Sequence, residues 1–172
     1  IYVNPTQFDQ VDDFNGYPST LHEDVERARA CGVDYVLLPC YEQLYADDFR
    51  FRVTEDRESK SLEGRRDGHF SGVLTVVMKL LQIVSPQRAY FGEKDYQQYQ
   101  LIRDMVSAFF MPIDVVPCAT VREPAGLAMS SRNQRLTAKG RDMASLLYRE
   151  LCAGRSAASV SAALESVGIH VD

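Results

Sequence analysis

A turn that could bind a phosphate is predicted at Phe91 to Gln98, where a glycine, a lysine and two carboxylates stand between a strand and a helix. The aromatic run before it follows Pro86 and is typical of a buried strand, and apolar residues at helical spacing follow from Leu101 to Phe109. Backbone N–H groups at a helix N-terminus and the helix dipole favour anions. Lys94 is therefore a candidate phosphate ligand, although an exposed charge pair of Lys94 and Asp95 at an ordinary helix start explains the turn equally well.

The same turn carries a pattern typical of a helix cap. Asp95 and Gln98 are spaced D-x-x-Q, as in a capping box. In the first turn of the helix, Gln98 can point toward the same pocket as Lys94, or it can serve the cap alone.

A second polar cluster lies at Ser130, Ser131 and Arg132. Two hydroxyls, successive N–H donors and a bidentate guanidinium fit a polyphosphate. A serine-rich turn with a solvated arginine is the simpler alternative for this cluster taken alone. Asn4 and Gln7 are neutral amides that can hold a hydroxyl or a carboxylate, although Asn4-Pro5 by itself is typical of a turn.

Histidine and metal chemistry have little support in the sequence. His22, His69 and His170 are expected to be structural or exposed, with His69 beside Arg65 and Arg66 as a candidate neighbour of an anion. The four cysteines are scattered without a C-x-x-C pair, which excludes the usual zinc spacings and indicates reduced, cytoplasmic thiols. No Walker motif, G-x-G-x-x-G, G-x-S-x-G or H-E-x-x-H occurs.

The composition is that of an ordinary globular protein, and it bounds the partners. A net charge of −5 and a pI near 5.2 argue against nucleic acid or an anionic membrane, because both require a basic surface. The longest apolar run, Val73 to Val84, is interrupted by polar residues and is not a membrane span. Any bound phosphate must therefore be met by a local cationic site.

Strands alternate with helices along the chain, which predicts an α/β fold with a doubly wound parallel sheet. The predicted strands cover 33–38, 88–91 and 113–117, with an edge strand or hairpin arm at 49–53 and a short strand at 121–123. The predicted helices start at Thr20 (ending at Gly32), at Gly72 (ending at Val84), at Asp95, at Thr137 and at Ser156. The character changes near residue 120, so domains are predicted at 1–120 and 121–172. Ile1 to Val3 and Gly168 to Asp172 are interpreted as parts of strands, as expected for an internal fragment.

Six motifs together resemble the pantothenate synthetase family, in the family's order and over most of the chain. They are V-N-P-x-Q-F at 3–8, Y-P-S-T at 17–20, L-E-G at 62–64, H-F-S-G-V-L-T-V-V at 69–77, F-G-E-K-D-Y-Q-Q at 91–98 and G-L-A-M-S-S-R-N at 126–133. The resemblance implies a Rossmann-like, nucleotidylyltransferase-like ligase that joins pantoate to β-alanine through a pantoyl-adenylate and releases pyrophosphate and AMP. It also implies a homodimer, Mg²⁺ as a companion of ATP, and a C-terminal lid domain that begins near residue 121.

The resemblance also implies roles for individual residues. Lys94 and Arg132 would be catalytic, through their contacts with the phosphates. ATP would be held by Gly92, Glu93, Lys94, Asp95, Val121, Met129, Ser130, Ser131 and Arg132. Pantoate would be held by Gln7 and Gln98, with Gln7 also near the β-alanine site and Asn4 supporting the pocket. The metal ligands are not identified, and a Mg²⁺-related role of Glu23 and Asp24 has little support.

One family motif is missing from this sequence. Members carry H-x-G-H after their first strand, and that sequence does not occur between Ile1 and Asp172. We expect it upstream of Ile1; the alternative is a truncated relative without full activity. A related nucleotidyltransferase and a catalytically silent nucleotide-binding fragment therefore remain alternative functions.

Overall fold

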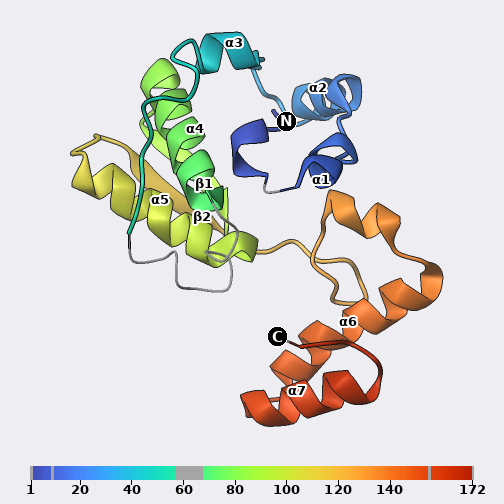
Figure 1. Ribbon diagram of the computed structural model, residues 1–172. Coiled ribbons are helices and arrows are strands. Elements are labelled where there is room, and N and C mark those ends of the chain that lie inside the picture. The colour runs from blue at the N-terminus through green and yellow to red at the C-terminus, as the bar shows by residue number, and fades with distance from the viewer. Residues whose placement is uncertain (1, 9, 57–67, 155, 172) are drawn as a thin grey trace. The chain divides into compact units, whose positions relative to one another are not determined.

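The computed structural model describes residues 2–8, 10–56, 68–154 and 156–171 (Figure 1). The chain divides into two compact units, Ile1–Cys118 and Ala119–Asp172. This division lies beside the boundary near residue 120 that the sequence suggests. Each unit is described below by itself.

The first unit combines helices with a small parallel sheet. Its elements in chain order are η1 (Pro5–Gln7), α1 (Val11–Asn15), α2 (Leu21–Ala30), α3 (Tyr41–Leu44), α4 (His69–Val84), β1 (Arg88–Gly92), η4 (Glu93–Asp95), α5 (Tyr96–Ala108) and β2 (Asp114–Cys118). Strand β1 pairs in parallel with β2, from Arg88 opposite Asp114 to Gly92 opposite Cys118. Because α5 connects two parallel neighbours, β1, α5 and β2 form a βαβ unit, and the predicted α/β class is confirmed.

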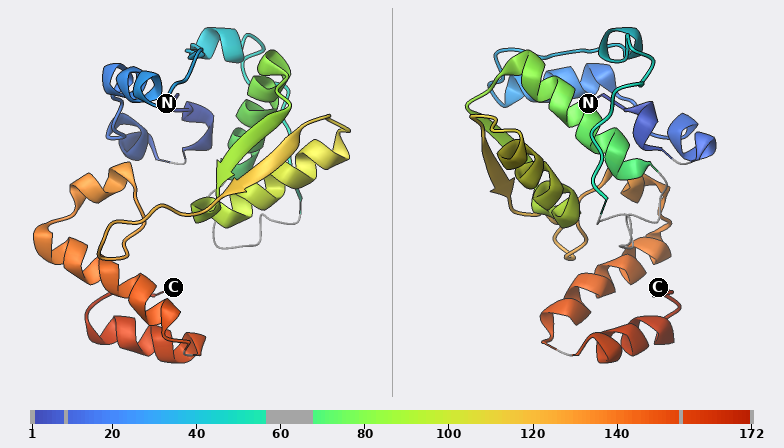
Figure 2. Two further views of the ribbon diagram at one scale, coloured as in Figure 1. Left: turned by 180° about the vertical axis from the view of Figure 1, so that it is seen from behind. Right: turned by 60° about the vertical axis from the view of Figure 1, so that its left-hand side comes forward.

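Helices α4 and α5 pack on each other and on one face of the sheet. Alternate residues of β1, Ala89 and Phe91, and Val115 of β2 contact this core. The view from behind in Figure 2 shows both strands on the same side of the two helices. The structure thus has a two-stranded sheet, and the doubly wound arrangement remains a prediction.

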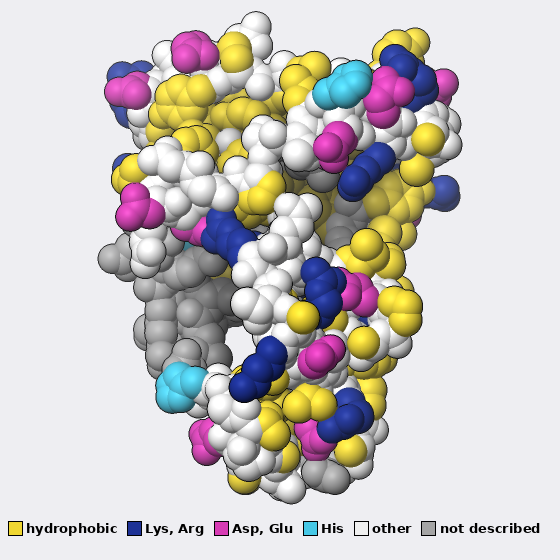
Figure 3. All heavy atoms as spheres, turned by 90° about the vertical axis from the view of Figure 1, so that its right-hand side faces the viewer, with side chains coloured by type: hydrophobic (Ala, Val, Ile, Leu, Met, Phe, Trp, Pro, Cys, Tyr) yellow, Lys and Arg dark blue, Asp and Glu magenta, His cyan; other side chains and the backbone are white. Residues whose placement is uncertain are grey.

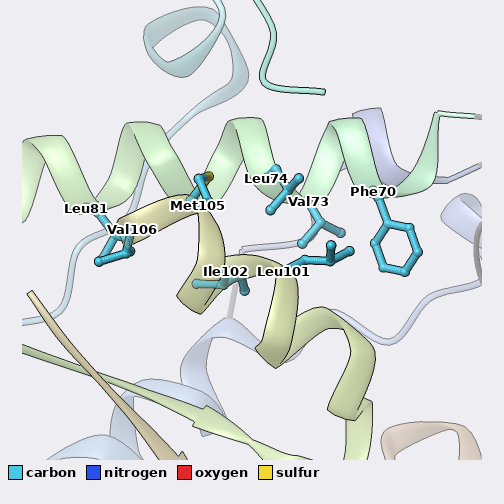
Figure 4. Packing of buried hydrophobic residues seen from close by; sticks show 8 residues of the cluster. All are labelled: Phe70, Val73, Leu74, Leu81, Leu101, Ile102, Met105 and Val106. Atoms are coloured by element: carbon cyan, nitrogen blue, oxygen red, sulfur yellow. The ribbon is translucent and has the colours of Figure 1, made fainter. Parts of the chain in front are cut away.

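The core between α4 and α5 also sets the direction of the two helices. Its buried members are Phe70, Val73, Leu74, Leu81, Leu101, Ile102, Met105 and Val106. Figure 4 shows Phe70 and Val73 beside Leu101 at one end, and Leu81 beside Val106 at the other. The two helices therefore run in the same direction, and both begin at the same end of the unit.

The predicted helices are found, with small shifts at their ends. Helix α4 begins at His69, three residues before the expected Gly72, because Gly68 adopts a left-handed conformation with φ of 75° and turns the chain into the helix. Helix α2 ends as predicted, with Gly32 at φ of 78°. There the N–H groups of Gly32 and Val33 bond to the carbonyls of Arg29 and Ala28, which is a Schellman motif.

Several strand predictions are wrong. Residues 33–38 and 49–53 form no strand, and neither do the described residues of the two chain ends, 2–3 and 168–171. The large apolar side chains of 33–38 are exposed, Tyr35 by 92%. The apolar runs have the composition of buried strands, but a strand needs a partner ladder, and no described residues pair with these segments.

The second unit is mainly helical. It contains η5 (Ser131–Arg135), α6 (Ala138–Cys152) and α7 (Ala157–Ser166). Thr137 and Ser156 cap α6 and α7 as predicted, since their hydroxyls accept hydrogen bonds from the N–H groups of Gly140 and Ser159. The short strand predicted at 121–123 is reduced to one antiparallel bridge between Arg122 and Ala128.

One face of the described residues shows mixed charge. On the face in Figure 3, coloured basic and acidic side chains are interspersed among apolar ones, unlike the continuous basic surface that nucleic acid requires. Within the described ranges, no helix is long and apolar enough to cross a membrane. The four cysteines, Cys31, Cys40, Cys118 and Cys152, are free and exposed.

The α4–α5 core makes a prediction about stability. Ile102 is completely buried, so Ile102→Ala should lower the free energy of unfolding by about 2–5 kcal/mol through lost apolar burial and a residual cavity. Ile83→Ala is the matched control, because Ile83 is 60% exposed on α4. Urea denaturation followed by circular dichroism measures both, and equal losses in the two variants would contradict the assigned core.

Candidate nucleotide and substrate sites

The turn after β1 carries the predicted phosphate ligand. Strand β1 ends at Gly92, the 3-10 turn η4 follows, and α5 begins at Tyr96. The side chain of Lys94 is 40% exposed, and its Nζ lies 3.4 Å from Asp95 Oδ1. A Cβ built on Gly92 would meet no atom within 4 Å, so the space in front of this glycine is open. The turn thus presents an accessible cation beside the start of a helix.

The predicted capping box at this turn is wrong. Asp95 is the N-cap residue of α5, but its side chain makes no capping hydrogen bond. Its carboxylate pairs with Lys94 instead, because η4 inserts a 3-10 turn before the helix. Gln98 is half-buried in the first turn of α5 and is not needed for a cap.

A second polar group surrounds Asn4, which is only 3% exposed. Asn4 Oδ1 accepts hydrogen bonds from Tyr45 OH at 2.8 Å and from Thr6 Oγ1 at 3.1 Å. Asn4 Nδ2 donates to the carbonyl of Gly72 and to Gln7 Oε1, both at 3.3 Å. An amide has two N–H donors and two lone pairs on oxygen, so the hydrogen-bonding capacity of Asn4 is full. Its side chain therefore has no hydrogen-bonding group left for a ligand, and Gln7 is one of the neighbours that it holds.

His69 belongs to the same group. Its Nδ1 lies 2.8 Å from the carbonyl oxygen of Gln7. A carbonyl only accepts, so Nδ1 carries the proton in this contact. His69 therefore holds the backbone of η1. The neighbouring Arg65 and Arg66, and the L-E-G motif at 62–64, lie outside the described residues.

The packing of α4 against α5 determines where the network around Asn4 lies relative to the turn with Lys94. Asn4 and Gln7 are held by His69 and Gly72 at the start of α4. Lys94 and Gln98 lie at the start of α5, and both helices begin at the same end of the unit (Figure 4). The sequence-predicted amides and the predicted phosphate ligand thus share one end of the first unit.

The remaining predicted residues lie in the second unit. Ser130 is the N-cap of η5, and its Oγ accepts the backbone N–H of Arg132 at 3.2 Å. Ser131 and Arg132 are exposed, as are Met129 and Val121, whose backbones are joined by a hydrogen bond from the N–H of Met129 to the carbonyl of Val121. The hydroxyls and guanidinium predicted to bind phosphates are therefore at the surface of this unit.

An ion pair between Glu123 and Arg141 stabilises the loop that carries Ser130, Ser131 and Arg132. Arg141 Nη1 donates to both oxygens of Glu123, at 2.7 and 2.8 Å, and Arg141 Nη2 donates to the carbonyl of Asn133. Asn133 Nδ2 donates to Glu123 Oε1 and to the carbonyl of Ala128. The hydrogen bonds from Arg141 and then from Asn133 lower the pKa of Glu123. Residues 128–133 are thereby tied to α6.

The residues that hold both groups in position could not be recognised from the sequence. Tyr45 lies 41 positions from Asn4, and Arg141 lies 18 positions from Glu123. No spacing rule connects positions so far apart, and a tyrosine directly after a short helix carries no special signal. Asn133 belongs to the motif at 126–133, which is the one signal that could have marked its role.

Metal binding by side chains alone has no support in the described part of the chain. No group of three or more His, Cys, Asp or Glu residues there could hold a metal ion. Glu23, for which a Mg²⁺-related role was considered, faces Arg27 at 3.6 Å on the exposed surface of α2. Its neighbour Asp24 accepts a hydrogen bond from Thr20.

Comparisons with known proteins agree with one another. A family model described as pantoate-beta-alanine ligase matches residues 1–170. A pantothenate synthetase of Legionella pneumophila strain Lens is 49% identical over 173 residues, which cover 100% of this chain and 69% of that protein.

Two solved structures are similar in fold as well as in sequence. One is a pantoate-beta-alanine ligase of Francisella tularensis complexed with beta-gamma ATP and beta-alanine; it has a TM-score of 0.89 and 38% identity, over 98% of this chain and 66% of that one. The other is a pantothenate synthetase of Thermus thermophilus, with a TM-score of 0.87 and 41% identity, over 97% of this chain and 64% of that one. The chain thus spans about two thirds of the length of these proteins.

The ion pair between Glu123 and Arg141 predicts that the stability of the protein depends on pH. The pKa of Glu123 is lower in the folded state, so its contribution to stability is present above the ordinary glutamate value, about 4.3, and is lost as pH falls through the lowered value. Thermal unfolding between about pH 7 and pH 3 should show this loss, and Glu123→Gln should remove it. Glu165→Gln, an exposed change in the same unit, is the control. If the thermal stability of Glu123→Gln depended on pH as that of the wild type does, the stabilising role of the Glu123–Arg141 ion pair would be contradicted.

Proposed function

The chain belongs to the pantoate-beta-alanine ligase family, a family of ATP-dependent ligases, and from this premise we propose that the protein condenses pantoate with β-alanine to form pantothenate. The resemblance predicted from the sequence motifs is confirmed. The observation that carries the proposal is the match of the family model to residues 1–170, which include both polar groups described above.

The proposed reaction has two steps. A carboxylate oxygen of pantoate attacks the α-phosphorus of ATP, the bond to the β-phosphate breaks, and pyrophosphate leaves. The neutral amine of β-alanine then attacks the acyl carbon of this pantoyl-adenylate, loses a proton, and AMP leaves. Neither step needs a nucleophile from the protein. The protein has to align the carboxylate with the phosphate and neutralise the charge that develops.

Lys94 and Arg132 are the cations that we assign to the phosphates. The accessible ammonium of Lys94 at the start of α5 supports the first assignment, and the exposed guanidinium of Arg132 on a braced loop supports the second. We assign the remaining ATP contacts to Gly92, Glu93, Asp95, Val121, Met129, Ser130 and Ser131. The open space in front of Gly92 supports an approach of the nucleotide there.

We assign pantoate to the amides of Gln7 and Gln98, with Gln7 also near β-alanine. Neutral amides suit a hydroxy acid better than a polyphosphate, because they offer donors and acceptors without a full charge. The common end of α4 and α5, where both residues lie, supports this assignment. Asn4 supports the pocket without a free hydrogen-bonding group of its own.

Mg²⁺ enters the proposal as a companion of ATP. Mg²⁺ is commonly held by substrate phosphates with only one or two protein carboxylates, and the absence of a metal-binding cluster among the described residues fits this arrangement. When bound, the ion neutralises phosphate charge. Glu93 and Asp95 are the carboxylates beside the proposed phosphate site.

The finer architecture is also proposed. We infer that residues 1–120 contribute to a doubly wound, Rossmann-like nucleotide-binding domain and that residues 121–172 begin a lid domain, which would keep water from the mixed anhydride. The helix-rich composition of the second unit supports a separate body. The family resemblance supports a homodimer, and four free cysteines support a reducing, cytoplasmic environment.

Isotope exchange tests the proposed function. Labelled pyrophosphate should enter ATP only when pantoate is present, because only pantoate supplies the attacking carboxylate. The reaction should also release AMP, and β-alanine should be needed for pantothenate. Release of ADP and phosphate would exclude the adenylate route, and a complete lack of exchange would favour a silent nucleotide-binding protein.

Two substitutions should separate the phosphate role from the pantoate role. Lys94→Ala should lower turnover by about 100-fold, since it removes a charge that acts on the transition state. Gln98→Ala should instead raise KM for pantoate more than KM for ATP. Arg103→Ala, which removes an exposed cation of α5, is the control for charge and should change neither. Wild-type turnover in Lys94→Ala would leave Lys94 an ordinary surface residue.

A further inference from the structure

We infer that Tyr45 and Asn4 form a positioning relay that turns the side-chain amide of Gln7 so that its NH₂ group, rather than its oxygen, is offered to the substrate. The inference rests on the proposed function for the identity of that substrate, pantoate. It names Tyr45 as a residue that acts on binding without touching the ligand.

The relay begins at a group whose role is fixed. The carbonyl of Gly72 can only accept a hydrogen bond, so the atom of Asn4 that faces it must be Nδ2. This fixes the orientation of the Asn4 amide, which could otherwise be turned by 180°. Asn4 Oδ1 then faces Tyr45 OH at 2.8 Å, and the phenol donates to it.

The orientation of the Asn4 amide also determines the orientation of the Gln7 amide. Asn4 Nδ2 is also the atom that faces Gln7, at 3.3 Å, so Gln7 must present its oxygen Oε1 as the acceptor. The NH₂ group of Gln7 therefore lies on the other side of the amide. No described residue accepts a hydrogen bond from this group, and the side chain of Gln7 is only half-buried. Two N–H donors thus remain for an oxygen of a ligand.

Tyr45 is suited to hold the relay because its ring is held on several sides. The ring packs with Leu44 and Val76, and it contacts the tilted ring of Tyr41 at 4.9 Å and the ring of Phe49 edge-to-face at 5.4 Å between centroids. Lys79 Nζ lies 4.8 Å from the ring centre. Burial raises the pKa of the Tyr45 phenol, so it keeps the proton that it donates to Asn4.

Close packing of η1 on α4 keeps the relay in register. A Cβ on Gly72 would overlap the carbonyl oxygen of Thr6 and would lie 2.8 Å from the backbone N of Gln7. Glycine at this position therefore lets the backbone that carries Gln7 lie directly against the helix. His69 Nδ1 holds the same backbone through the carbonyl of Gln7.

Tyr45→Phe is the direct test, since it keeps the ring and removes only the hydroxyl. We expect KM for pantoate to rise about five-fold, the equivalent of one neutral hydrogen bond, while KM for ATP and kcat stay near wild type. Tyr41→Phe is the matched control, because the ring of Tyr41 contacts that of Tyr45 and Tyr41 has no hydrogen bond to Asn4. An unchanged KM for pantoate in Tyr45→Phe, or an equal rise in Tyr41→Phe, would overturn the relay.

Gln7→Glu tests the orientation of the amide. Glutamate keeps the oxygen that faces Asn4 but replaces the NH₂ donors by an acceptor. We therefore expect Gln7→Glu to bind pantoate at least as poorly as Gln7→Ala. A KM for pantoate near wild type in Gln7→Glu would show that Gln7 offers oxygen to the substrate, and the inference would fail.

A measurement without substrate separates the relay from the proposed function. In NMR spectra of the ligand-free protein, Tyr45→Phe should shift the side-chain NH₂ signals of Asn4 and Gln7, and Tyr41→Phe should leave them in place. Unshifted signals in Tyr45→Phe would overturn the relay whatever the protein binds. Shifted signals in a protein that shows no pantoate-dependent exchange would support the relay and reject the pantoate assignment.

Discussion

The packing of α4 against α5 is the contact on which the first unit depends. It joins residues 70–81 with residues 101–106 and also contacts one face of the β1–β2 sheet. Because α5 connects two parallel strands, it runs antiparallel to them, and the shared core gives α4 the same direction. Both helices therefore begin at the same end of the unit. The turn with Lys94 and the network around Asn4 lie at those beginnings, so the position of each depends on the same core.

A steric constraint governs the finer geometry. The backbone of η1 approaches α4 so closely that only glycine fits at position 72. This approach lets Asn4 reach the carbonyl of Gly72, and the bonds of Asn4 then orient Gln7. A buried polar side chain is costly unless it is fully hydrogen-bonded, and Asn4 meets this condition with four partners. Burial of Asn4 therefore fixes one arrangement of the neighbouring side chains.

The two units hold their polar loops by different means. In the first unit, the turn with Lys94 follows directly from the end of β1 and the start of α5. In the second, residues 128–133 run from a single β-bridge into the short helix η5, and the Glu123–Arg141 pair and Asn133 tie them to α6. A loop that is tied in this way can present exposed side chains such as Arg132 at a lower entropic cost than a free one.

The sequence by itself determined the features that depend on neighbouring residues. Examples are the caps at Thr137 and Ser156, the left-handed glycine after α2, the turn between β1 and α5, and the motifs that identified the family. It did not determine which apolar runs form strands. Residues 33–38 have a strand's composition, but strand formation depends on a partner elsewhere in the chain. Only the tertiary structure decided that Tyr45 meets Asn4 and that Arg141 meets Glu123, because contacts between distant positions arise from packing and leave no local periodicity or spacing in the sequence.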